Sequence, residues 1–109
     1  MEKTVYHIVV PEYWDKYKDF DYYRSPTFVE EKFIHLSKKE QVEGTLNRYF
    51  TDREKILLLH IDTAKLSAEL IYESATNQEL FPHLYGKLNK SAIVNVEELS
   101  RGENGFFKY

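Results

Sequence analysis

The hydrophobic and polar positions of the chain alternate in short segments, and the strongest strand signal lies at Lys55–Asp62. In this segment Leu57, Leu59 and Ile61 share one face of a strand, and the positions between them are also largely apolar. Side chains alternate between the two faces of a strand, so this segment can bury both faces. The same two-faced pattern predicts a first strand at residues 4–10, central in its sheet.

Several shorter segments are also typical of strands or loops. Three segments rich in β-branched, aromatic and other apolar residues are predicted as strands: residues 33–37, Glu69–Ser74 and residues 92–99. Residues 75–79 are polar and predict a loop. Residues 81–86 contain Pro82 and Gly86, which argue against an interior strand because proline cannot donate to the hydrogen-bond ladder. Residues 101–109 contain two glycines and little pattern, which is typical of a loose tail or an edge strand.

The helices are expected to be short. Residues 11–18 begin with a proline suited to the first helical position, and residues 27–32 predict a helical turn. A clearer helix is predicted from Ser37, which forms a Ser-x-x-Glu capping box with Glu40. Its apolar stripe follows at helical spacing: Val42, Leu46, Tyr49 and Phe50. Gly44 weakens this helix by about 1 kcal/mol relative to alanine, which favours a close approach of another backbone at that point.

These elements predict the fold class. Strands and helices are mixed without the regular strand–helix–strand alternation of parallel sheets. That order favours an α+β fold with a mostly antiparallel sheet and short helices. A chain of 109 residues has the length of a single domain, which we place at residues 1–109.

Composition narrows the classes of function. The absence of cysteine excludes disulfides, zinc–thiolate sites and a cysteine nucleophile, and it fits a reducing compartment. We see no signal-peptide pattern and no apolar segment of the about 18 residues that a membrane span needs, so a cytoplasmic protein without a membrane partner is expected. A net charge of −3 with only four arginines argues against a nucleic-acid partner. The oligomeric state is left open.

Four histidines, His7, His35, His60 and His83, raise the question of a metal site. Imidazole is a common metal ligand. However, none of the four has a metal-binding spacing such as His-x-His or His-Glu-x-x-His. We therefore predict no metal, and for His60 a hydrogen-bonded place within its apolar strand.

Other polar residues each have a structural and a functional interpretation. Ser37 serves either as a helix cap alone or as a cap that also contacts a ligand. Glu73 lies in an apolar strand, either exposed at a sheet edge or as a pocket carboxylate. Phe81 and Tyr85 flank His83, where ordinary packing and ligand binding both fit. No Gly-x-Ser-x-Gly elbow and no glycine-rich phosphate loop is present.

Several motifs follow one another over nearly the whole chain: Tyr6-His7-Ile8-Val9, Trp14, Phe33-Ile34-His35-Leu36-Ser37, Leu59–Asp62, Glu73 and Phe81-Pro82-His83-Leu84-Tyr85-Gly86. Their order resembles the family called domain of unknown function 952. The motif at residues 33–37 and the motif at residues 81–86 are specific in combination. The resemblance implies an ADP-ribosyltransferase-like fold, which is a split α+β core around a cleft for the nicotinamide dinucleotide NAD.

A more distant resemblance points to the same fold. Tyr6-His7 is similar to the Tyr-His-Gly-Thr motif of RNA 2′-phosphotransferases, and residues 33–37 are similar to their His-Val-His-Leu-Ser motif. Here Ile8 and Val9 replace the glycine and threonine of the first motif. The arginines before that motif and the winged-helix part have no counterpart, so removal of an RNA 2′-phosphate is not expected.

The resemblance implies two hypotheses of function. The first is an NAD-glycohydrolase or ADP-ribosyl-transfer enzyme, whose oxocarbenium-like transition state needs a facing carboxylate. The residues that it assigns are Glu73 and His35 as catalytic, and His7, Ser37, His83 and Tyr85 as cofactor-binding. The alternative is a non-catalytic module of the same fold that binds a small ligand or a protein partner. The lost glycine after His7 and the lack of clustered arginines favour this alternative.

Overall fold

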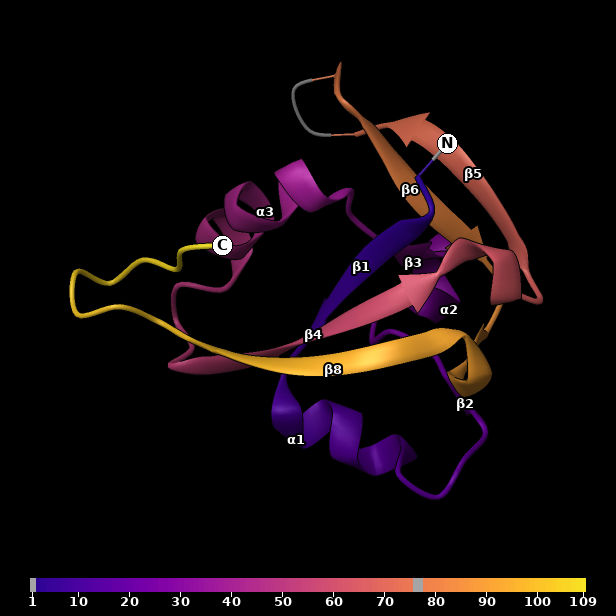
Figure 1. Cartoon of the computed structure of the whole chain (residues 1–109), viewed down its shortest axis with the longest axis horizontal. Coiled ribbons are helices and arrows are strands. Elements are labelled where there is room, and N and C mark those ends of the chain that lie inside the picture. Colours follow the sequence, from indigo (N-terminus) through magenta and orange to yellow (C-terminus); the bar gives the residue numbers. More distant parts are fainter. Residues whose placement is uncertain (1, 76–77) are drawn as a thin grey trace.

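Strand β4 (Lys55–Asp62) is the middle strand of a three-stranded antiparallel sheet, between β1 (Thr4–Val9) and β8 (Ile93–Ser100) (Figure 1). The computed structural model describes residues 2–75 and 78–109. It confirms the predicted strand and its two buried faces. Leu59 and Ile61 belong to one hydrophobic cluster, and Ile56 and Leu58 belong to another on the opposite face.

Strand β1 was expected to be central, and this prediction was wrong. It pairs with β4 along its whole length, but among the described residues its other side makes only an isolated antiparallel bridge between Tyr6 and Ser37. The two backbone N···O distances of this bridge are 2.9 and 2.7 Å. Both faces of β1 are apolar because both faces of the sheet are covered: Val5 packs in one cluster and Ile8 in the other.

A second antiparallel sheet is formed by β3 (Ile34–His35), β6 (Leu80–Tyr85) and β5 (Glu69–Ser74), with β6 in the middle. The strand at Glu69–Ser74 is confirmed, whereas the exclusion of an interior strand at residues 81–86 was wrong. The carbonyl of Pro82 accepts a hydrogen bond from Leu36, directly after β3 ends. In an antiparallel ladder the N and O of one residue face the same neighbour, so the missing N–H of Pro82 falls where the pairing stops.

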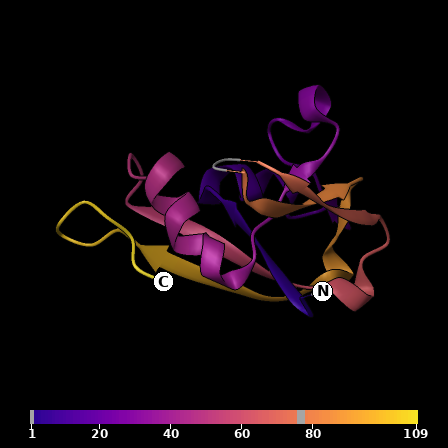
Figure 2. The ribbon, with the colours of Figure 1, turned by 90° about the horizontal axis from the view of Figure 1, so that it is seen from above.

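The two sheets form separate layers that enclose the larger hydrophobic cluster, and α2 projects beyond the second sheet (Figure 2). Strand β2 (Tyr22–Tyr23) pairs with β7 (Leu88–Asn89) over two residues. This pairing closes one end of the cluster, because Tyr23 and Leu88 are both fully buried. The strand predicted at residues 92–99 is confirmed as β8. The loop predicted at residues 75–79 includes residues 76 and 77, which lie outside the described residues.

The helices are short, as predicted: α1 (Pro11–Trp14), α2 (Phe28–Glu31) and α3 (Val42–Tyr49). The expected capping box at Ser37 was wrong, because the backbone of Ser37 is bound to Tyr6. Helix α3 instead follows a 3-10 turn, in which the side chain of Gln41 accepts a hydrogen bond from the N–H of Lys38 at 2.9 Å. Within the described residues, none of the helices combines the length and the apolar character that crossing a membrane requires.

Gly44 lies in the first turn of α3, where a close approach of another backbone was expected. This expectation was wrong: a Cβ placed on Gly44 meets no atom within 4 Å. Replacing Gly44 with alanine is therefore expected to raise the free energy of unfolding by about 1 kcal/mol, since alanine loses less backbone freedom in a helix. Urea denaturation measures this change. The matched control, Gly105→Ala, is expected to destabilise the fold, because Gly105 has φ of +89°.

The C-terminal segment, residues 101–109, is neither a loose tail nor an edge strand. It forms a loop beyond β8 and returns to α3 (Figure 1). The side chain of Asn47 donates to the carbonyl of Phe107 at 3.0 Å and accepts from its N–H at 2.7 Å. The Phe107 ring is buried among Val42, Leu46 and other members of the second cluster. The segment therefore completes the core beneath α3.

Candidate functional site

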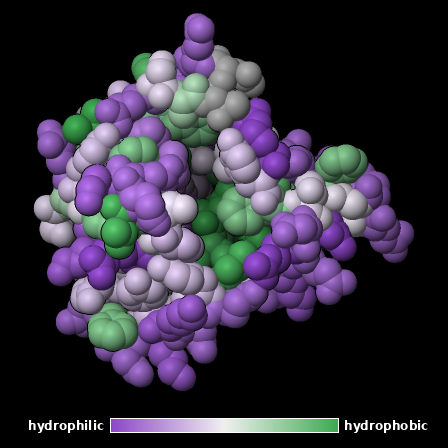
Figure 3. Space-filling model, turned by 180° about the vertical axis from the view of Figure 1, so that it is seen from behind, coloured by the Kyte–Doolittle hydropathy of each residue, from purple (hydrophilic) through white to green (hydrophobic). Residues whose placement is uncertain are grey.

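A cleft of about 550 Å³ opens between β1, α3 and the β3–β6–β5 sheet. Seen from behind, the molecule has a hollow with an apolar floor and a largely hydrophilic rim (Figure 3). Five aromatic side chains are among those that line the cleft: Tyr13, Tyr23, Tyr49, Phe50 and Phe81. A concave, largely apolar site of this volume with a few polar groups is typical of small-molecule binding.

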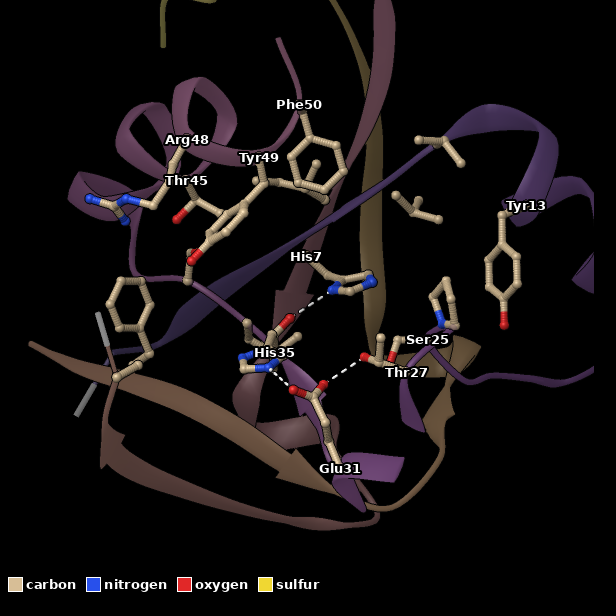
Figure 4. A pocket seen from close by; sticks show the side chains of 18 of the residues that line it. His7, Tyr13, Ser25, Thr27, Glu31, His35, Thr45, Arg48, Tyr49 and Phe50 are labelled. Atoms are coloured by element: carbon tan, nitrogen blue, oxygen red, sulfur yellow. Dashed lines mark hydrogen bonds and ion pairs between the residues drawn. The ribbon is translucent and has the colours of Figure 1, made fainter. Parts of the chain in front are cut away.

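Apart from His7, His35 and Ser37, the polar side chains named here lie at two ends of the cleft (Figure 4). Arg48 and Thr45 come from α3 at one end, beside Tyr49 and Phe50. At the other end lie three residues from α2 and the segment before it: Ser25, Thr27 and Glu31. His7 and His35 lie between these ends. The cleft therefore offers a cationic end and a carboxylate end to a ligand.

His7 is hydrogen-bonded through both ring nitrogens. Its Nδ1 lies 2.8 Å from the backbone oxygen of His35, and its Nε2 lies 2.8 Å from the hydroxyl oxygen of Tyr23. A carbonyl only accepts, so Nδ1 carries the proton and the hydroxyl of Tyr23 donates to Nε2. Burial lowers the pKa of His7 to about 4, so the ring is neutral at pH 7. In this arrangement His7 ties β1 to β2 and β3, and a ligand would have to displace one of the two bonds.

Glu31 and His35 form the polar pair nearest the carboxylate end. The Oε2 of Glu31 lies 3.0 Å from Nε2 of His35, and its Oε1 accepts a hydrogen bond from the hydroxyl of Thr27 at 2.6 Å. Burial raises the pKa of Glu31, but the hydrogen bonds from Thr27 and His35 outweigh it, and the net shift is downward. The carboxylate is therefore ionised at neutral pH, and two neighbours fix its position.

Glu73, His83 and Tyr85 form a second group on the same face of the β3–β6–β5 sheet, but they do not line the cleft. One oxygen of Glu73 lies 2.8 Å from Nδ1 of His83 and accepts a hydrogen bond from the Tyr85 hydroxyl at 2.6 Å. The bonds from Tyr85 and His83 lower the pKa of Glu73, and the bond to Glu73 raises the pKa of Tyr85. The Phe33 ring stacks on His83 with the ring centroids 4.1 Å apart.

The two groups meet at the cross-strand pair of His35 and His83, whose ring centroids are 4.9 Å apart. Of the six residues that the sequence assigned to a site, His7, His35 and Ser37 line the cleft. Glu73, His83 and Tyr85 lie together beyond this pair. The six residues that the sequence assigned to a single site therefore lie in two adjoining groups, of which one faces the cleft.

Comparison with known proteins identifies the family. A family described as a protein of unknown function, DUF952, matches residues 8–96. This chain belongs to the DUF952 family. The motif order in the sequence predicted this membership, which is now confirmed.

Solved structures of another protein have the same architecture. The crystal structure of CC0527 from Caulobacter crescentus superposes with a TM-score of 0.87 at 27% sequence identity, over 96% of this chain and 93% of that chain. The solution NMR structure of CC0527 gives a TM-score of 0.82 at 27% identity, over 96% of this chain and 91% of that one. The search of curated proteins gave no match.

The sequence analysis missed several polar residues of the cleft, among them Ser25, Thr27, Glu31 and Arg48. The sequence does carry a signal for the group of Thr27, Glu31 and His35, which is the spacing of four residues between successive members. Helix α2 holds Glu31 in its last turn, and Lys32 ends the helix in a left-handed conformation with φ of 72°. Arg48 carried no local signal, because its place at the cleft depends on how α3 packs.

His60 lies away from the cleft of this DUF952 protein. Its Nε2 lies 2.9 Å from a carboxylate oxygen of Glu97, and its ring meets the Tyr6 ring edge-on at 5.0 Å. The predicted hydrogen-bonded place for His60 is confirmed. Over residues 2–75 and 78–109, no three His, Asp or Glu side chains are grouped so that they could hold a metal ion.

Proposed function

We propose that this protein binds a nucleotide-like small molecule in the cleft between β1, α3 and β3, and that NAD is the first candidate. The observation that carries the proposal is the cleft itself, which joins an apolar, aromatic lining to polar groups at two ends. Aromatic rings stack on the flat base of a nucleotide. The volume of about 550 Å³ lies within the range of small-molecule sites.

The cationic end of the cleft supports a ligand with a phosphate. Arg48 is exposed on α3 and lines the cleft, 6.0 Å from the centroid of the Tyr49 ring. A guanidinium donates paired hydrogen bonds that match a phosphate group. Next to it, Thr45 adds a hydroxyl that also lines the cleft. An aromatic base among the rings and a phosphate at Arg48 therefore use both kinds of surface.

Binding is better supported than cleavage of the ligand. An enzyme that breaks the nicotinamide–ribose bond needs a carboxylate facing the developing positive charge. Glu73, the carboxylate assigned to this role, does not line the cleft, and the carboxylate that does, Glu31, is held by hydrogen bonds from Thr27 and His35. The non-catalytic module of an ADP-ribosyltransferase-like fold is therefore the form of the proposal that we favour. Release of nicotinamide from NAD is the assay for the enzymatic alternative.

Titration of isotope-labelled protein with NAD and with ADP-ribose tests the proposal by NMR. We expect shifts that cluster at His35, Ser37 and Tyr49 and that saturate below about 1 mM, which corresponds to about 4 kcal/mol of binding free energy. Replacing Arg48 with glutamine is expected to weaken binding about tenfold, because a charge-assisted hydrogen bond to phosphate is lost.

The matched control is Lys39→Gln, which removes a positive charge from an exposed residue that does not line the cleft. This variant is expected to bind both nucleotides as the wild type does. Absence of shifts at several millimolar nucleotide would contradict the proposed function. An equal loss of affinity in both variants would show only a general effect of charge and would remove Arg48 from the site.

A further inference from the structure

The carboxylate of Glu31 has unused hydrogen-bonding capacity. A carboxylate can accept about four hydrogen bonds, two at each oxygen. Thr27 occupies one place on Oε1 and His35 occupies one place on Oε2. These two bonds hold the group in a fixed orientation, and the Glu31 side chain remains 37% exposed. One lone pair on each oxygen therefore remains for a pair of donors that arrives from the cleft.

Ser25 supplies an independent observation at the same end of the cleft. The residue is only 8% exposed, and it lines the cleft. Its hydroxyl oxygen is buried and has no hydrogen-bond partner within the described parts of the chain. Buried hydroxyls are normally hydrogen-bonded, and an unpaired one costs about 1–3 kcal/mol. An unpaired hydroxyl at the same end of a cleft as a carboxylate with free lone pairs is the pattern expected where a polar ligand group completes the bonding.

We propose that Ser25, Thr27 and Glu31 form a subsite for two neighbouring hydroxyl groups of the ligand, such as the vicinal diol of a ribose. The two hydroxyls donate one hydrogen bond to each oxygen of Glu31, while Ser25 bonds to one of them. The identity of the molecule that carries the diol rests on the proposed function. The subsite itself rests on the bonds of Glu31 and on the unpaired hydroxyl of Ser25.

The charge of Glu31 also predicts what this subsite rejects. A phosphate ester on one of the hydroxyls would bring a second negative group beside an ionised carboxylate, and like charges at this distance repel. A sugar that lacks one hydroxyl would leave one oxygen of Glu31 and the Ser25 hydroxyl without a partner. The phosphate that distinguishes NADP from NAD is on the 2′-hydroxyl of the adenosine ribose, and this is the ribose that we assign to the subsite. NAD should therefore bind more tightly than NADP, and ADP-ribose more tightly than the form that lacks the 2′-hydroxyl of this ribose.

Isothermal titration calorimetry of NAD, NADP and ADP-ribose against three proteins tests the subsite. The proteins are the wild type, Glu31→Gln, and the control Glu30→Gln, which removes the neighbouring exposed carboxylate of α2. Loss of a hydrogen bond to a charged group corresponds to about a tenfold or greater change in affinity. We expect wild type and Glu30→Gln to prefer NAD over NADP at least about tenfold. Glu31→Gln should lose that preference.

Titration with methyl β-D-ribofuranoside and with its 2-deoxy form separates the subsite from the proposed function. The 2-deoxy furanoside has no vicinal diol. Shifts at Ser25 and Glu31 with the ribofuranoside, but not with its 2-deoxy form, would support the diol subsite even if no nucleotide bound. Equal binding of NAD and NADP to the wild type would overturn the subsite and leave the proposed function standing. Absence of binding by both the nucleotides and the ribofuranoside would overturn both proposals.

Discussion

Replacing Phe107 with alanine is expected to lower the free energy of unfolding by about 3–5 kcal/mol. The Phe107 ring is 3% exposed and packs with Val42 and Leu46, which come from α3. Its removal leaves a cavity between the helix and the first sheet that the surrounding side chains cannot fill. A loss of this size is a large part of the 5–15 kcal/mol that stabilises a typical domain.

Urea denaturation of Phe107→Ala and of the control Phe106→Ala measures this effect. Phe106 is the adjacent residue and is 56% exposed, so its replacement should change the free energy of unfolding by about 0.5 kcal/mol or less. Equal effects of the two substitutions would contradict the docking of residues 101–109.

Acid is expected to destabilise the fold through His7 by about 3 kcal/mol. The pKa of His7 is about 4 in the folded protein and about 6.5 in the unfolded chain. Between these values the unfolded chain binds a proton that the folded protein excludes. Stability is therefore lost as the pH falls from about 6.5 to about 4, and His7 contributes no pH dependence above that interval.

The free energy of unfolding of the wild type and of His7→Asn, measured from pH 4 to pH 8, isolates this contribution. Asparagine does not titrate, and its amide can still donate a hydrogen bond toward the backbone oxygen of His35. The variant should be less stable at pH 7, and its stability should fall less steeply below pH 6.5. Identical pH profiles would show that His7 is not the neutral, buried group described above.

The sequence predicted those elements whose burial follows from local pattern. The segment Lys55–Asp62 formed a strand because both of its faces are apolar, and both faces meet a cluster. The errors concern residues whose partners are far away in the chain. Pro82 lies in a middle strand because its neighbour β3 ends after two residues, and Ser37 is not a cap because Tyr6 binds its backbone.

The sequence predicted part of the candidate site and missed the rest for the same reason. The bridge between Tyr6 and Ser37 holds the motif at residues 33–37 beside β1. His35 and Ser37 therefore line the cleft. Glu73 does not, because its side chain turns to His83 and Tyr85 on its own sheet. The position of Arg48 depends on the packing of α3, which no local pattern encodes.

The bridge between Tyr6 and Ser37 joins the two layers at the cleft. Its two hydrogen bonds, together with the bond from His7 to the backbone of His35, link β1 of the first sheet to the segment of β3 in the second. His7 and His35 also line the cleft, so any widening of the cleft between the sheets acts directly on these three bonds. The amides of Tyr6 and Ser37 are therefore the positions at which deuterium exchange reports how often the two layers separate.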